Sequence, residues 1–342
     1  MKPAMPTLSK KRTAVMLILF AALCIPLGIY IGKTWEARTH RNMFHEVRSG
    51  GYQFINPLVE CESSSEFYIN TELRPFQFKV KELVERMLRE HRAAEISIYY
   101  RDLNNGPWFG IDEDKPFAPA SLLKVPVMLA YLKWAESEPR ILLEKIVYSG
   151  GDDKSSIQNF PPLQHLVPGK AYTVDELLYR MIAYSDNNAD FLLFHRLPED
   201  RLLAVYKDLN VDYDPGNKAD NMSVSSYASF FRVLFNASYL NNDMSEKALK
   251  ILSFPEFNGG LIAAIPPDVK VASKFGERVF VKQNAEIIQL HNVGVIYYPG
   301  RPFLLGVMTR GTNFGTQADV IRDITRLVYN EVDHQIREKN NK

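Results

Sequence analysis

Cysteine is scarce in this sequence, which has 342 residues and only 2 cysteines. That number is too small for a disulfide scaffold or for a zinc site built from cysteines. Cys24 lies inside a long apolar run and Cys61 lies outside it, so we expect no disulfide within the folded part. Two alternatives stay open for Cys61, a free thiol and a bond to a second chain.

An excess of charge of one sign is also missing. The 41 basic residues nearly balance the 40 acidic ones, which leaves a formal net charge of +1 at pH 7. A nucleic-acid-binding domain needs a clustered basic surface, so we expect no nucleic-acid partner. The 7 histidines show no H-E-x-x-H or comparable spacing, and we therefore predict no metal site and no cofactor.

One long hydrophobic run is present near the N-terminus. Residues 13–32 (TAVMLILFAALCIPLGIYIG) carry no charged side chain, and about 20 residues of helix cross the hydrocarbon core of a bilayer. Lys10, Lys11 and Arg12 precede the run, and such basic flanks stay in the cytoplasm. We therefore predict a cytoplasmic tail over 1–12 and a single transmembrane helix in bilayer lipid, with the rest of the chain outside. A cleaved signal peptide and a buried core helix remain as alternatives.

The chain after this run divides into two parts. Residues 33–75 lack clean periodicity and contain Gly50-Gly51 and a run of three serines, which is typical of a juxtamembrane stalk. From residue 76 the pattern becomes regular, which predicts one domain over 76–342. The 46% hydrophobic and 24% charged residues are close to globular averages and exclude a fibrous or wholly disordered chain.

The pattern of the domain predicts strands at both ends and helices in the middle. An antiparallel sheet flanked by N- and C-terminal helices, with an inserted all-α lobe, satisfies that order and makes the fold class α/β (α+β). The expected elements are a helix at 78–92, strands at 95–101 and 108–111, a mainly helical stretch at 121–252, strands at 269–273, 287–298 and 303–309, and a helix at 316–332.

Three short motifs carry the candidate chemistry. Two of them, S-x-x-K and K-x-G, each arise by chance about once in a chain of this size, so their surroundings must supply the specificity. The first motif opens an apolar helix, the second ends a helix that begins at Thr173, and the third is expected to end a strand. In chain order they are Ser121–Lys124, Ser185–Asn187 (S-D-N) and Lys274–Gly276 (K-F-G).

These motifs resemble the S-x-x-K, S-D-N and K-T-G elements of class A serine β-lactamases and their penicillin-binding relatives. The resemblance spans residue 76 to the C-terminus. It implies a β-lactamase/transpeptidase-like fold and a hydrolase or acyltransferase that forms an acyl-enzyme with β-lactams or peptidoglycan-type amides. It also implies these roles: Ser121 as nucleophile, Lys124 as base, Ser185 as proton relay, and Lys274 as a catalytic residue that holds the substrate carboxylate and biases the local field. Asn187, Phe275 and Gly276 are the implied substrate contacts, and the backbone N–H groups of Ser121 and Glu277 are the implied oxyanion hole.

The chemistry of the first motif supports this assignment. A serine hydroxyl is a poor nucleophile and needs a base. Residues three apart on a helix share a face, so Lys124 is expected to reach the Ser121 hydroxyl. An amine acts as a base only if its pKa, about 10.4 in water, is lowered. Burial and the second cation Lys274 both act in that direction.

Two departures from the family pattern put turnover in question. Phe275 replaces the hydroxyl residue of K-T-G, which removes a group that binds a substrate carboxylate and places a bulky ring there. The family's deacylating glutamate belongs to a loop that looks trimmed here, since a helix is expected to begin near Ser223. Asp214, before Pro215, is either a weak substitute for that glutamate or a turn residue. The alternative function is therefore a binding or sensor domain with slow or no deacylation.

Arg310 is a weaker candidate, because it follows a predicted strand and carries a charge that suits a substrate carboxylate. A surface role is the alternative for this arginine.

Overall fold

The computed structural model describes residues 47–48, 53–55, 58–59, 73–104, 106–212, 221–282 and 285–340. The predicted tail, the predicted membrane span and Cys61 lie outside these residues. None of the described helices combines the length and the apolar character needed to span a bilayer. Strands β1 (Val47–Arg48) and β2 (Leu58–Val59) form an antiparallel pair in a small unit of their own.

The main domain is built on a five-stranded antiparallel sheet with the order β4-β3-β9-β8-β7. Strand β7 therefore lies at one edge, and the last three strands of the chain are neighbours. This architecture confirms the predicted fold class. The strands are β3 (Glu95–Asp102), β4 (Trp108–Ile111), β7 (Val271–Lys282), β8 (Ala285–Ile296) and β9 (Phe303–Gly311).

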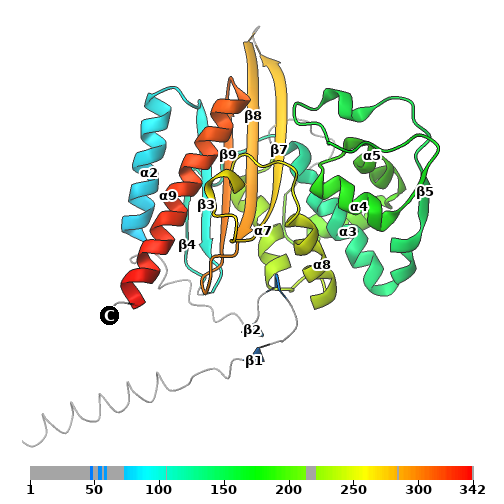
Figure 1. Cartoon of the computed structure of the whole chain (residues 1–342), viewed down its shortest axis with the longest axis horizontal. Helices are drawn as coiled ribbons and strands as arrows, with labels where there is room; N and C mark the ends of the chain where they lie inside the picture. The colour runs from blue at the N-terminus through cyan, green and yellow to red at the C-terminus, as the bar shows by residue number, and fades with distance from the viewer. Residues whose placement is uncertain are drawn as a thin grey trace, which may run out of the picture. The chain divides into compact units, whose positions relative to one another are not determined.

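Helices cover both faces of the sheet (Figure 1). The helices α2 (Arg74–Arg89) and α9 (Phe314–Asn340) pack side by side on one face. The buried side chains of α2 recur at helical spacing, which places them on the stripe that faces the sheet. They are Phe76, Val80, Leu83, Val84 and Met87. These side chains form part of an apolar layer between the two helices and the strands, as the sequence pattern predicts.

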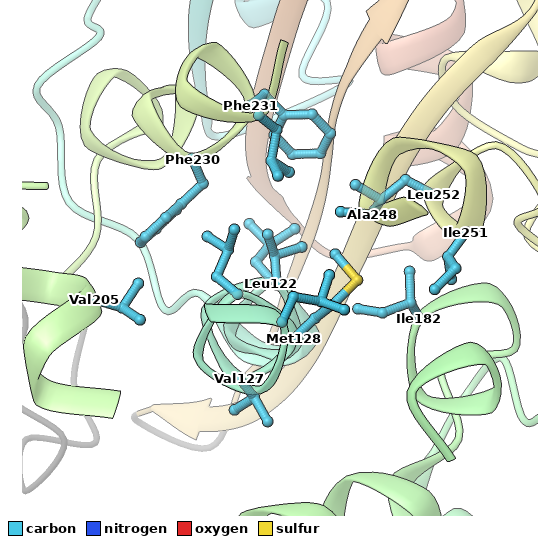
Figure 2. Packing of buried hydrophobic residues seen from close by; sticks show 14 of the residues in the cluster. Leu122, Val127, Met128, Ile182, Val205, Phe230, Phe231, Ala248, Ile251 and Leu252 are labelled. Carbon is cyan, nitrogen blue, oxygen red and sulfur yellow. The ribbon is translucent and has the colours of Figure 1, made fainter. Parts of the chain in front are cut away.

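The helical lobe on the other face is organised around α3 (Lys124–Ser137). This helix is apolar almost all round, which is typical of a helix buried on every side. Figure 2 shows Met128 of this helix, with Leu122 of the preceding turn, facing side chains from other helices of the lobe, among them Ile182, Phe231 and Ala248. The helices of the lobe after α3 are α4 (Val174–Ala183), α5 (Asn187–Arg196), α6 (Glu199–Asp208), α7 (Val224–Phe235) and α8 (Asn242–Leu252).

Two details differ from the sequence prediction. The stretch predicted as mainly helical also contains the two-stranded antiparallel sheet of β5 (Lys145–Val147) and β6 (Ala171–Thr173). The strand expected to end at Lys274 continues to Lys282. Polar and charged residues after Lys274 interrupt the apolar alternation, and an edge strand tolerates them because only one side of it is paired inside the sheet.

A short segment of the predicted stalk packs on the main domain. The backbone N–H groups of Gln53, Phe54 and Ile55 donate to the Glu246 carboxylate on α8, at 2.8, 2.7 and 3.1 Å. The Phe54 ring is 2% exposed and makes an edge contact with the ring of Tyr297, whose hydroxyl donates to the Phe54 carbonyl at 2.9 Å. We call residues 53–55 the strap. Phe54 and Ile55 are buried, so the strap is part of this domain.

We expect Phe54→Ala to lower the free energy of unfolding by about 3 kcal/mol, because truncating a buried phenylalanine leaves a cavity. Phe78 on α2 offers a matched control, since its side chain is 61% exposed, and Phe78→Ala should cost less than about 0.5 kcal/mol. Chemical denaturation of both variants measures the difference. Equal effects would show that the strap does not contribute to stability.

Candidate active site

Ser121 lies in a tight turn that neighbouring elements hold in place. The turn is the 3-10 helix η2 (Ala120–Leu123), and Ala120 adopts a left-handed backbone with φ of 50°. On its N-terminal side the Ala118 N–H donates to Gln289 Oε1 at 2.9 Å, and the Ala118 carbonyl lies 3.1 Å from His291 Nε2. Among the described residues, none is hydrogen-bonded to the half-buried Ser121 hydroxyl. Neighbouring residues therefore hold the backbone of the turn in place, while the Ser121 hydroxyl is left available to react.

Gly276 brings the edge strand β7 against this turn. A Cβ atom at Gly276 would lie 2.8 Å from the Pro119 carbonyl oxygen and 3.2 Å from the Leu122 nitrogen. Side chains do not fit at such distances from backbone atoms, so only glycine permits this approach. The last residue of the third motif therefore sets the spacing between β7 and the Ser121 turn.

Lys124 is the first residue of α3, and its side chain is 2% exposed. Its ammonium donates to the Ser185 carbonyl at 2.6 Å and to Asn187 Oδ1 at 2.7 Å, with a longer contact of 3.3 Å to Ser185 Oγ. Burial lowers the pKa of Lys124 to about 8, against the opposing charges of Asp190, Asp186 and Glu277. Among described residues its ammonium has no hydrogen bond to the Ser121 hydroxyl; the link between the two residues is the Lys124 N–H, which donates to the Ser121 carbonyl.

Ser185 lies between two lysines. It has a left-handed backbone with φ of 53°, directly before Asp186, whose side chain caps α5 by accepting from the N–H groups of Asn188 and Ala189. The Lys274 ammonium donates to Ser185 Oγ at 2.8 Å and to the Phe275 carbonyl at 2.9 Å. Burial first, and then the charge of Lys124, hold the pKa of Lys274 well below its usual value. The three motifs thus meet at one place. Lys124 of the first motif and Lys274 of the third both contact the Ser185 hydroxyl of the second.

Phe275 is directed into an aromatic cluster and is 5% exposed. Its ring stacks on Phe257 with a centroid distance of 4.4 Å and meets Phe160 edge-on at 6.0 Å. The Lys274 ammonium lies 4.4 Å from the centroid of the same ring. The ring therefore covers the buried ammonium from one side, where a cation over an aromatic face is favourable.

A loop between η4 (Lys154–Ile157) and β6 connects the second and third motifs. Gln158 donates to the Ser185 carbonyl at 3.1 Å and accepts from the Asn187 N–H at 3.3 Å. The Glu277 carboxylate accepts from the N–H groups of Asn159 and Phe160 at 3.1 and 3.0 Å. Sequence reasoning missed these side-chain roles, as it missed those of Gln289 and His291, because each partner is more than 25 residues away.

The remaining candidates lie elsewhere or outside the described residues. The Arg310 guanidinium is ion-paired with Glu95 and lies over the Phe117 ring at 5.0 Å. Asp214 falls outside the described part of the chain. A helix does begin after Ser223, which caps α7 by accepting from the Ser226 N–H. Within the described residues no three His, Cys, Asp or Glu side chains are grouped in a way that suits a metal ion.

The fold is that of solved serine β-lactamases and a penicillin-binding protein. A class A β-lactamase from Mycobacterium abscessus matches with a TM-score of 0.63 at 21% identity, covering 74% of this chain and 99% of the other. A β-lactamase from Xanthomonas campestris matches at 0.61 and 18%, covering 73% and 96%. A mutant of PBP-A, solved as an acyl-enzyme complex with penicillin G, matches at 0.62 and 22%, covering 77% and 97%.

The family follows from the sequence match as well as from the fold. The model of the β-lactamase enzyme family matches residues 79–332, which include all three motifs. The chain belongs to this family of serine β-lactamases and penicillin-binding proteins.

Proposed function

We propose that the protein is a serine acyl hydrolase or acyltransferase in which Ser121 forms an acyl-enzyme with β-lactams or with D-Ala-D-Ala-type amides of peptidoglycan. The observation that carries this proposal is the buried contact of both lysine ammonium groups with Ser185, 3.3 Å from Lys124 and 2.8 Å from Lys274. Two amines with lowered pKa values share the Ser185 hydroxyl, and one of them belongs to Lys124, three residues after Ser121, so they supply a base and a path for a proton.

In the proposed reaction the Ser121 oxygen attacks the amide carbonyl while its proton passes to the neutral amine of Lys124. The backbone N–H groups of Ser121 and Glu277 would hold the developing oxyanion, and one such donor is typically worth about 2.7–4 kcal/mol. The proton then reaches the leaving nitrogen through the Ser185 hydroxyl, the C–N bond breaks, and the acyl group remains on Ser121. Asn187 and Gly276 are the proposed neighbours of the substrate, and Arg310 is a weaker candidate for its carboxylate.

The second candidate function is a binding or sensor domain that is acylated and then hydrolyses slowly. Phe275 favours it, because a buried ring occupies the position at which the resemblance implies a hydroxyl for the substrate carboxylate. Asp214 is the proposed deacylation residue of the hydrolase, and its weakness as a base would lengthen the life of the acyl-enzyme.

We also propose that residues 13–32 anchor the protein in the cell membrane, with the 1–12 tail in the cytoplasm and the domain outside. An uncharged run of that length with basic residues before it supports this topology. Cell-wall peptides are then accessible to the site. Protease added to intact spheroplasts should digest the domain. A domain that survives this treatment would show that it lies on the cytoplasmic side.

A fluorescent penicillin tests the acylation at Ser121. We expect covalent labelling of the full chain, detected on a denaturing gel and by mass spectrometry, and complete loss of the label in Ser121→Ala. Release of the label within minutes supports the hydrolase, whereas a label that persists for hours supports the sensor. A wild-type chain without label, folded by circular dichroism, would contradict β-lactam acylation.

A further inference from the structure

Two side chains of β7 beside the Ser121 turn face the same way. Phe275 and Glu277 are two residues apart in a regular antiparallel pairing with β8, so their side chains lie on one face of the strand. Both contact Phe160: the Phe275 ring meets its ring edge-on at 6.0 Å, and the Glu277 carboxylate accepts from its N–H at 3.0 Å. Gly276 between them packs against the Ser121 turn. The strand therefore presents an apolar ring and a carboxylate next to the candidate nucleophile.

The two buried lysines of the site are poorly placed to receive a substrate anion. The Lys124 and Lys274 side chains are 2% and 1% exposed, and burial lowers the pKa of both. Each ammonium already donates to a protein carbonyl, and the Phe275 ring covers that of Lys274 at 4.4 Å from its centroid. A carboxylate on the substrate would have to displace these contacts to reach either amine.

Two more cations near the motifs are already paired. The Arg310 guanidinium forms an ion pair with Glu95. Lys154, whose carbonyl accepts from the Asn187 side chain at 3.2 Å, forms an ion pair with Asp152. The positive charge of both residues is therefore compensated by a neighbouring carboxylate.

The Glu277 carboxylate has backbone donors but no cation partner. Its oxygens accept from the Asn159 N–H at 3.1 and 3.2 Å and from the Phe160 N–H at 3.0 Å, and none of the described residues forms an ion pair with it. The residue is half-buried, so its charge is not fully screened by water. An uncompensated negative charge thus lies beside the Phe275 ring.

We infer that Glu277 is a specificity-determining residue that makes the site prefer acyl donors without a free carboxylate beside the scissile amide. Like charges brought together reduce affinity, and proteins use such repulsion to reject a competitor. A buried carboxylate also needs a hydrogen-bond donor, and Phe275 supplies none where the resemblance implies a hydroxyl. A neutral leaving group meets neither penalty. The inference rests on the proposed acylation of Ser121 and narrows its substrate class to neutral amides and lactams.

A fluorescent penicillin and its methyl ester provide the test, because the two compounds differ in the charge of one group. On the full chain we expect the ester to label Ser121 about tenfold faster than the acid. Glu277→Gln removes the charge and keeps the backbone N–H, so the ratio of ester rate to acid rate should fall about tenfold. Faster labelling of the wild type by the acid, or an unchanged ratio in Glu277→Gln, would overturn the inference.

The ratio separates charge from structure. A looser 159–160 segment or a distorted oxyanion hole slows both compounds, whereas a charge effect acts on the acid alone. Glu286→Gln is the matched control, since Glu286 is exposed on β8 and lies opposite Val281, five residues beyond Gly276. We expect its ratio to stay within about twofold of the wild type because water and salt screen an exposed charge. A shift as large as that of Glu277→Gln would overturn the inference, because net charge would then explain both.

Equilibrium binding distinguishes a failure of this inference from a failure of the proposed function. Ser121→Ala cannot be acylated, and isothermal titration calorimetry measures the Kd of the acid and of the ester on this variant. A Kd about tenfold lower for the ester supports the inference even if the wild type is never labelled. Equal Kd values, tighter binding of the acid, or no binding of either compound would overturn it. Absence of covalent label on the folded wild type contradicts the proposed function alone.

Discussion

Lys124→Ala is expected to slow acylation of Ser121 by about a thousandfold, because general-base catalysis of this kind contributes roughly 10²–10⁴ in rate. The alanine cannot take the serine proton, and the Lys274 ammonium remains bound to Ser185 and the Phe275 carbonyl. The rate of fluorescent-penicillin labelling measures the effect. Lys133→Ala is the matched control, since Lys133 lies on the same helix with its side chain 45% exposed.

The Lys124→Ala variant should remain folded. Lowering the pKa of Lys124 from 10.5 to about 8 corresponds to a cost of roughly 3 kcal/mol for burying the charged form. Because the folded pKa is the lower one, this cost is fully present below a pH of about 8 and disappears as the pH rises through the unfolded value. Removing the amine relieves it, which offsets the acceptors left unpaired at Ser185 and Asn187. Acylation within tenfold of the wild type would assign the base to another residue.

Gly276→Ala is expected to lower the acylation rate by about a hundredfold, because a misplacement of about 1 Å at a reacting group has effects of that size. The new Cβ would meet two backbone atoms of the Ser121 turn, at Pro119 and Leu122, and neither can move as a side chain does. Overpacking of this kind also costs about 1–3 kcal/mol of stability. Labelling kinetics and chemical denaturation measure the two effects.

Gly306→Ala provides the control for that prediction. A Cβ at Gly306 on β9 would lie 2.6 Å from the Val224 side chain, so the variant is overpacked as well. Its contacts do not include the Ser121 turn, and its acylation rate should stay within about threefold of the wild type. If Gly276→Ala is labelled at the same rate as this control, the spacing between β7 and the turn does not matter for catalysis.

Hydrophobic periodicity predicted most of the fold correctly. Patterns of period 2 and 3.6 predicted the strand at 95–101 and the helix at 316–332, and the structure has β3 at Glu95–Asp102 and α9 at Phe314–Asn340. The aromatic residues Tyr227, Phe230, Phe231 and Phe235 lie on one stripe of α7 and are all buried. Periodicity could not predict β5 and β6, because strands of three residues carry too little pattern, or the end of β7, because an edge strand accepts polar residues.

The candidate site was only partly predictable. Lys124, Ser185 and Lys274 could be selected because their motifs occur in a specific order, and the structure brings these three side chains together. Helical spacing alone predicted a hydrogen bond between the Lys124 ammonium and the Ser121 hydroxyl. The ammonium instead donates to the Ser185 carbonyl and to Asn187 Oδ1, acceptors that come from a segment about 60 residues further along the chain.

The sequence by itself determined the family, the order of the motifs and the residues that bear chemistry, because these depend on local patterns and residue types. The tertiary structure alone decided which groups surround them. Gln289 and His291 hold the Ser121 turn from a strand about 170 residues away, and the Glu277 carboxylate holds the backbone of Asn159 and Phe160 from a strand more than 100 residues later. Burial and charge act through distance in space, and a linear sequence records only distance along the chain.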